Sequence, residues 1–270
     1  MPQVATKASK ISSELTVYLT EGERLDDISF RRYLRDIDAL KDHVVEDYLK
    51  ALAFGAYGRV DDAIAHFELS LKTCRNEVVA KNFLVYLSDF GTLRKSFITS
   101  IELAEQFVSP FIYLHAYENC IFQGQMDLAE KYYHSYSKLF SGEELDSMEN
   151  KLEDVLFDVN YFKEVANLSG NEYELLLEKV TNVLDEHKVH PSALKFYGIS
   201  EEKVNAMILV AKTSEVEKLA DMNVELAFLL AEYDCLIQKN FSVWFEAEED
   251  HIQADKSDSA HIARGMLNVG

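Results

Sequence analysis

The chain has 270 residues, of which 48% are hydrophobic and 27% are charged, and its formal net charge is −20 at pH 7. This balance is typical of a folded chain with one large domain or two modest ones, and it excludes an intrinsically disordered protein. Most of the acidic excess lies in residues 141–270, which hold 27 acidic and 11 basic residues. Such a segment argues against nucleic acid as a partner, because phosphate contacts need Lys and Arg. It favours solubility and attraction to a basic protein partner, and a solvated acidic surface without a specific partner is the alternative interpretation.

Residues 1–25 are polar apart from one short apolar patch around Leu15–Leu19. They contain no apolar run that could serve as the core of a signal peptide, and no later run approaches the roughly 20 apolar residues of a membrane-spanning helix. We therefore expect residues 1–25 to form a polar N-terminal arm or a loosely docked helix. We also expect a cytoplasmic protein that does not enter membranes.

Residues 26–165 are predicted to form a domain of helical hairpins. Apolar residues recur at three- and four-residue steps from Asp26 onward, and Gly58, Gly91 and Gly124 follow one another at a spacing of 33 residues. Five positions after each glycine stands a small residue: Ala63, Ser96 and Ala129. Four positions further on, the first and third repeats have an aromatic residue and the second has a serine: Phe67, Tyr133 and Ser100. A fixed period near 33 residues with a glycine between two helical patterns predicts helix–turn–helix repeats. In each repeat the glycine would end the first helix and the small residue would let the second helix approach it closely.

The first repeat, which runs from Asp47 to Lys72, resembles a tetratricopeptide repeat. The matching small, aromatic and turn positions are Ala51, Phe54, Gly58, Val60, Ala63, Phe67 and Ser70 in the first repeat, and Tyr113, Gly124, Met126, Ala129 and Tyr133 in the third. The second repeat is degenerate, with Ser100 where an aromatic residue is expected. The resemblance covers about residues 44–140, and it departs from the family pattern at Asp47 and Lys50, where large apolar residues are usual, and in lacking the proline that closes each repeat.

The resemblance implies a binding groove, because in this family the first helix of each hairpin lines the concave side and holds an extended peptide or a helix. Carried over position by position, the predicted groove residues are Tyr48, Leu52, Lys81, Val85, Ser88, Phe111, Leu114 and Glu118. Burial of Leu52, Val85 and Leu114 in the core is an equally good interpretation of those three positions.

Beyond residue 140 the repeat fades. Residues 143–165 and 171–187 each predict an acidic amphipathic helix that could cap the repeats. Residues 193–199, 206–211 and 241–247 predict strands, and residues 215–236 predict a long helix between the second and third of them. The sequence thus predicts a small α/β domain over residues 166–250, with two strands and the helix in a crossover unit, and a flexible polar tail over residues 251–270. The fold class expected for the whole chain is mainly α, a solenoid of helical hairpins followed by a small α/β domain.

No catalytic or cofactor motif is present: the sequence has no GxxxxGK[ST], GxGxxG, GxSxG or HExxH. His187 and His190 lie three residues apart, but no third ligand is positioned near them by the sequence, so we expect no metal site. Cys74, Cys120 and Cys235 show no CxxC spacing, which favours buried free thiols over a disulfide or a zinc site. We therefore expect neither an enzyme nor a cofactor.

Three functions are compatible with these patterns. The first is a non-catalytic adaptor, chaperone-like protein or regulatory subunit that binds a protein or peptide in the groove of the repeats. The second is an acidic inhibitor, immunity protein or antitoxin that covers the active site of a basic partner, and its binding would weaken steeply with salt. The third is an enzyme with its site in residues 190–250. The sequence leaves the oligomeric state open.

Overall fold

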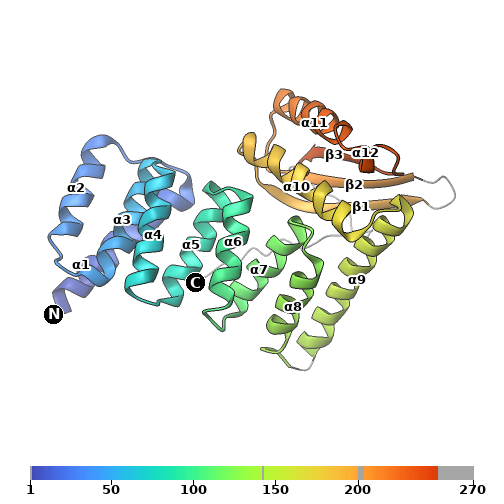
Figure 1. Ribbon diagram of the computed structural model, residues 1–270. Helices are drawn as coiled ribbons and strands as arrows, with labels where there is room; N and C mark the ends of the chain where they lie inside the picture. The colour runs from blue at the N-terminus through green and yellow to red at the C-terminus, as the bar shows by residue number, and fades with distance from the viewer. Residues whose placement is uncertain (1, 142, 200–203, 249–270) are drawn as a thin grey trace. The chain divides into compact units, whose positions relative to one another are not determined.

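A computed structural model describes residues 2–141, 143–199 and 204–248. The chain divides into two compact units, residues 1–91 and residues 92–270, and each is described by itself below. Twelve helices and three strands lie in the described ranges (Figure 1). The expected fold class, helical hairpins followed by a small α/β part, is confirmed. The tail predicted over residues 251–270 lies outside the described residues.

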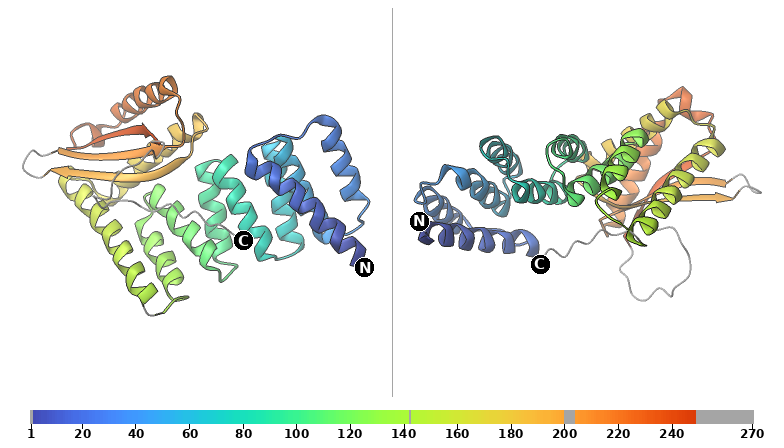
Figure 2. Two further views of the ribbon diagram at one scale, coloured as in Figure 1. Left: turned by 180° about the vertical axis from the view of Figure 1, so that it is seen from behind. Right: turned by 90° about the horizontal axis from the view of Figure 1, so that it is seen from below.

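The first unit consists of five helices, each packed against a neighbour in the sequence or the next but one (Figure 2). They are α1 (Pro2–Glu21), α2 (Asp27–Asp38), α3 (His43–Tyr57), α4 (Val60–Thr73) and α5 (Glu77–Phe90). Helix α1 occupies most of the segment that the sequence predicts as a polar arm or a loosely docked helix. It packs on α3 and buries Ile11 and Leu15 in the core of this unit, so residues 2–21 belong to the helical fold.

The turn between α3 and α4 explains the first glycine of the repeat. Gly58 has a φ of 91°, and its N–H donates to the carbonyl of Gly55 while the N–H of Arg59 donates to that of Phe54. A left-handed glycine with these two bonds ends a helix sharply and satisfies its last carbonyls. The predicted role of Gly58 is therefore confirmed.

The core of the first unit is aromatic where consecutive helices meet. Phe67, from α4, is fully buried, and its ring centroid lies 5.0 Å from that of Phe83 and 5.5 Å from that of Tyr86, both on α5. Ala63, one turn earlier on α4, is also fully buried. The small residue and the aromatic residue four positions later thus do what the repeat pattern predicts: one allows close approach and the other fills the space between helices.

The second unit begins with five further helices. They are α6 (Leu93–Ala104), α7 (Pro110–Phe122), α8 (Met126–Ser137), α9 (Glu143–Ala166) and α10 (Gly170–Glu186), so the two acidic helices predicted after residue 140 are confirmed. Gly124 ends α7 with a φ of 71°, as Gly58 ends α3. Gly91 also ends its helix, α5, as predicted, but its backbone is extended, with a φ of −84° and a ψ of 176°.

The chain then forms a three-stranded sheet with the order β1-β2-β3. Strand β1 (Pro191–Ile199) runs antiparallel to the central β2 (Val204–Ala211), and β3 (Ser242–Ala247) runs parallel to β2. Helix α11 (Val216–Ala231) connects β2 to β3 and packs on β3, as the predicted crossover unit requires (Figure 1). The single helix expected over 215–236 is divided in two, because Tyr233 adopts an extended backbone before the short α12 (Asp234–Ile237).

Side chains from α11 occupy the outer edge of β3. The amide of Asn223 donates from Nδ2 to the carbonyl of Phe245 and accepts from the N–H of Phe245 at 2.7 Å. These backbone groups are the ones that an edge strand otherwise offers to another strand. Asn223 therefore ties α11 to the sheet and blocks the middle of this edge.

Helix α9 packs on β1 and β2, and helix α10 packs on α6 and α11. The carboxylate of Asp185, near the end of α10, accepts from the N–H of Leu93 at 2.6 Å, at the start of α6. A Cβ added at Gly124 would lie 3.1 Å from the Cα of Glu174, so α10 also passes close to the end of α7. The boundary predicted between residues 165 and 166 thus falls inside the second unit, where the sheet and helices α6–α10 pack together.

Candidate partner-binding surfaces

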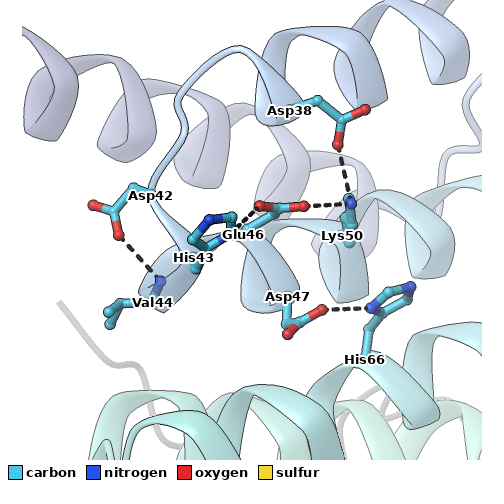
Figure 3. A network of polar contacts seen from close by, with 8 residues as sticks. All are labelled: Asp38, Asp42, His43, Val44, Glu46, Asp47, Lys50 and His66. Carbon is cyan, nitrogen blue, oxygen red and sulfur yellow. Dashed lines mark hydrogen bonds and ion pairs between the residues drawn. The ribbon is translucent and has the colours of Figure 1, made fainter.

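Asp47 and Lys50, the two departures from the apolar repeat pattern, form a polar network on α3 (Figure 3). Lys50 lies 2.6 Å from the carboxylate of Glu46 and 3.0 Å from that of Asp38. Asp47 lies 3.0 Å from Nδ1 of His66 on α4, so this pair joins the two helices of the hairpin. The ion pairs account for the polar residues at these positions, and they hold the surface of α3 in one arrangement.

Tyr48 marks the first helices of the first unit as one surface. It lies on α3 and is half-buried, and its hydroxyl accepts from the Nδ2 of Asn82 on α5 at 2.6 Å. The first helices of consecutive hairpins therefore touch directly, which is the arrangement that a groove lined by first helices needs.

The other predicted residues of this surface differ in what they offer a partner. Val85 is 46% exposed, Lys81 pairs with Glu77 at 2.8 Å, and the hydroxyl of Ser88 donates back to the carbonyl of Leu84. Leu52, in contrast, is buried in the core of the first unit and offers a partner no surface. Of the two interpretations left open for these positions, the structure supports burial for Leu52 and exposure for Val85.

Helix α7 carries the corresponding surface of the second unit. Phe111, Leu114 and Glu118 lie at helical spacing on it and are all half-buried, and His115 lies beside them with its ring 4.4 Å from that of Phe111. Burial raises the pKa of the Glu118 carboxyl to about 7 and lowers the pKa of His115 to about 4. Both groups are thus crowded by protein while part of their surface stays accessible.

Lys212, from beyond α10, lies near this surface. The side chain of Lys212, just after β2, is exposed, and its positive charge acts on Glu118 against the effect of burial. The N–H of Lys212 donates to the carbonyl of His190 at 2.8 Å, and burial, with the charge of Lys212 as a smaller cause, lowers the pKa of His190. No hydrogen bond or salt bridge joins Glu118 to another side chain in the part of the chain that the structure describes.

Sequence reasoning missed three of these residues. Asn82 and His115 lie on the predicted first helices, each three residues before a predicted groove residue, Val85 or Glu118. This helical spacing could have indicated them. Lys212 could not have been found this way, because 94 residues separate it from Glu118 and only the tertiary fold brings them close.

The remaining candidates for chemistry are dispersed. His187 lies 2.7 Å from the carboxylate of Glu225, and within residues 2–141, 143–199 and 204–248 no three His, Cys, Asp or Glu side chains are grouped where they could hold a metal ion. All three cysteines have free thiols: Cys120 is buried, Cys74 half-buried and Cys235 exposed, so the expectation of buried thiols is correct for Cys120 alone.

The described helices include none that combines the length and the apolar character needed to cross a membrane. In comparisons with known proteins, no family model, no curated protein and no solved structure matches the chain.

Proposed function

We propose that this protein is a non-catalytic, cytoplasmic adaptor or regulatory subunit that binds a basic segment of another protein on its first-helix surfaces. The observation that carries the proposal is the environment of Glu118 on α7. Its carboxyl is crowded by protein, has a pKa raised to about 7, and lies on one helix face with the half-buried Phe111 and Leu114. A Lys or Arg from a partner would supply a positive charge within ion-pair distance of this carboxylate and so favour its ionised form. The partner's apolar groups would cover Phe111 and Leu114.

The proposal includes the family. We propose that α3–α4 and α7–α8 are two hairpins of the tetratricopeptide type. The support is the 33-residue spacing, the left-handed Gly58 and Gly124, and the buried Ala63 and Ala129 five residues after them. The extended Gly91 and the buried Ser100 depart from the pattern, which is why the proposal depends on α3–α4 and α7–α8.

The test is a peptide-display selection with the full chain as bait, followed by affinity measurements on single variants. Tyr48→Ala, Phe111→Ala and Glu118→Gln should each weaken binding of the selected peptides at least tenfold, because each removes a central contact. Leu69→Ala on α4 is the matched control, since Leu69 is as exposed as Val85 but lies on a second helix. Circular dichroism confirms that each variant is folded.

Two results would contradict the groove. One is unchanged affinity in Tyr48→Ala and Phe111→Ala together. The other is binding that disappears with added salt and ignores all three substitutions, which would favour the acidic-inhibitor function instead, because screened long-range attraction would then explain the affinity.

A further inference from the structure

Helix α11 exposes a continuous apolar stripe. Val216, Val224 and Phe228 are 78%, 56% and 72% exposed. Three exposed alanines lie between and beyond them at helical spacing: Ala220, Ala227 and Ala231. Because residues three and four apart share a helix face, these six side chains form one band along the helix, which we call the α11 outer stripe.

The opposite side of α11 already supplies its packing. Met222 and Leu226 are buried, and the side chain of Asn223 makes two hydrogen bonds to the backbone of β3. The solvent side of a surface helix is normally polar, since one apolar face is enough to hold it on the fold. The α11 outer stripe is therefore apolar surface that this unit does not need for its own core.

One border of the stripe is acidic. The exposed carboxylates of Glu217, Asp221 and Glu232 follow the same side of the stripe, and none of the three is paired with a basic side chain in the described part of the chain. The one basic residue of α11 is Lys218, which is half-buried and lies 3.7 Å from the carboxylate of Glu215. The surface around the stripe thus carries negative charge without compensation.

We infer that the α11 outer stripe binds an amphipathic helix of another protein, whose apolar face is flanked by Lys or Arg. Small residues at Ala220, Ala227 and Ala231 allow close approach of a second helix, and Phe228 supplies an aromatic anchor. The acidic border selects the charge of the partner by complementarity.

Charge also decides against two other occupants. A second copy of this chain would bring the same three carboxylates and no basic residue on this face, so an antiparallel pairing of α11 with itself would set like charges against each other. An anionic membrane surface would be repelled by the same border.

This surface is separate from the first-helix surfaces of the proposed function and does not depend on them. The two surfaces share no residue, so the inference gives the proposed adaptor a second binding site. Substitutions on α11 leave Tyr48, Phe111 and Glu118 unchanged, so failure of one proposal is distinguishable from failure of the other.

The test uses the full chain and two synthetic helical peptides of about 18 residues, or five turns. Both carry the same leucine stripe, flanked by Lys in one and by Glu in the other, and a fluorescent label reports binding by anisotropy. The chain should bind the Lys-flanked peptide at least tenfold more tightly than the Glu-flanked one. Val224→Ser with Phe228→Ser should weaken that binding at least tenfold, whereas Ile28→Ser, at an even more exposed apolar residue of α2, should not.

The double substitution E217K/D221K sharpens the test, because it should reverse the preference toward the Glu-flanked peptide. Equal binding of both peptides, or an affinity unchanged by Val224→Ser with Phe228→Ser, would overturn the inference. Sedimentation of the chain alone provides the remaining outcome: a dimer that dissociates on Phe228→Ser would show that a second copy occupies the stripe, and the inference would then be wrong.

Discussion

Replacing Glu118 by glutamine should change how stability depends on pH. An exposed Glu in the unfolded chain has a pKa of 4.5, and burial on α7 raises the pKa to about 7. The folded state therefore keeps this proton to a higher pH than the unfolded state, so stability falls as pH rises from about 4.5 to about 7 and stays lower above it. At about 1.4 kcal/mol per pKa unit, the loss at this site amounts to about 3 kcal/mol.

Glu118→Gln removes this dependence, because the amide does not ionise. Urea unfolding of both proteins at pH 5 and pH 8 measures it. Because a small part of the loss has already occurred at pH 5, the variant should gain about 2–3 kcal/mol relative to the parent chain between the two conditions. His115, whose pKa burial lowers to about 4, weakens folding on the acid side in both proteins, so its contribution cancels in the difference. A difference between the proteins that does not change with pH would refute the account of a crowded, unpaired carboxyl.

Three further predictions concern the fold. Gly124→Ala should lower the stability measured by thermal unfolding more than Gly22→Ala does. Both glycines have a φ near 70°, so the left-handed backbone alone should cost each variant about 1 kcal/mol. A Cβ at Gly22 meets nothing within 4 Å, whereas a Cβ at Gly124 would lie 3.1 Å from the Cα of Glu174. Asp185→Ala should destabilise the second unit by about 1–2 kcal/mol, measured by urea unfolding, because a partly buried backbone donor loses its acceptor. A thiol reagent at pH 8 should modify Cys235 first and Cys120 only in the unfolded chain, since Cys120 is buried and burial raises the pKa of its thiol to about 12; mass spectrometry of the modified peptides shows the order.

The helices could be predicted from the sequence because local patterns determine them. The left-handed turns at Gly58 and Gly124 follow from the residue type, since glycine adopts a positive φ at low cost. Gly91 also ends a helix, but with an extended backbone, because a glycine fits both conformations and only the surrounding chain decides between the two.

Pairing between distant segments could not be predicted. The antiparallel pairing of β1 with β2 and the position of Lys212 near Glu118 depend on tertiary packing, for which neither periodicity nor composition gives a signal. Apolar residues occur on more than one side of α11, and the sequence does not show which of them are covered; the sheet and α10 cover only the face of Met222 and Leu226. The α11 outer stripe was therefore visible only in the structure.

The most direct test of the central claim, that the first helices bind a protein partner, is photo-crosslinking from single positions of the full chain in its native cells. Two variants each carry one photoreactive amino acid: the first in place of Val85, which is exposed on α5, and the second in place of Phe111 on α7. Both variants should form a covalent adduct with the same partner. The same group in place of Leu69, equally exposed on α4, should form none with it. An adduct from Leu69 alone, or no adduct from either first-helix position, would contradict the account.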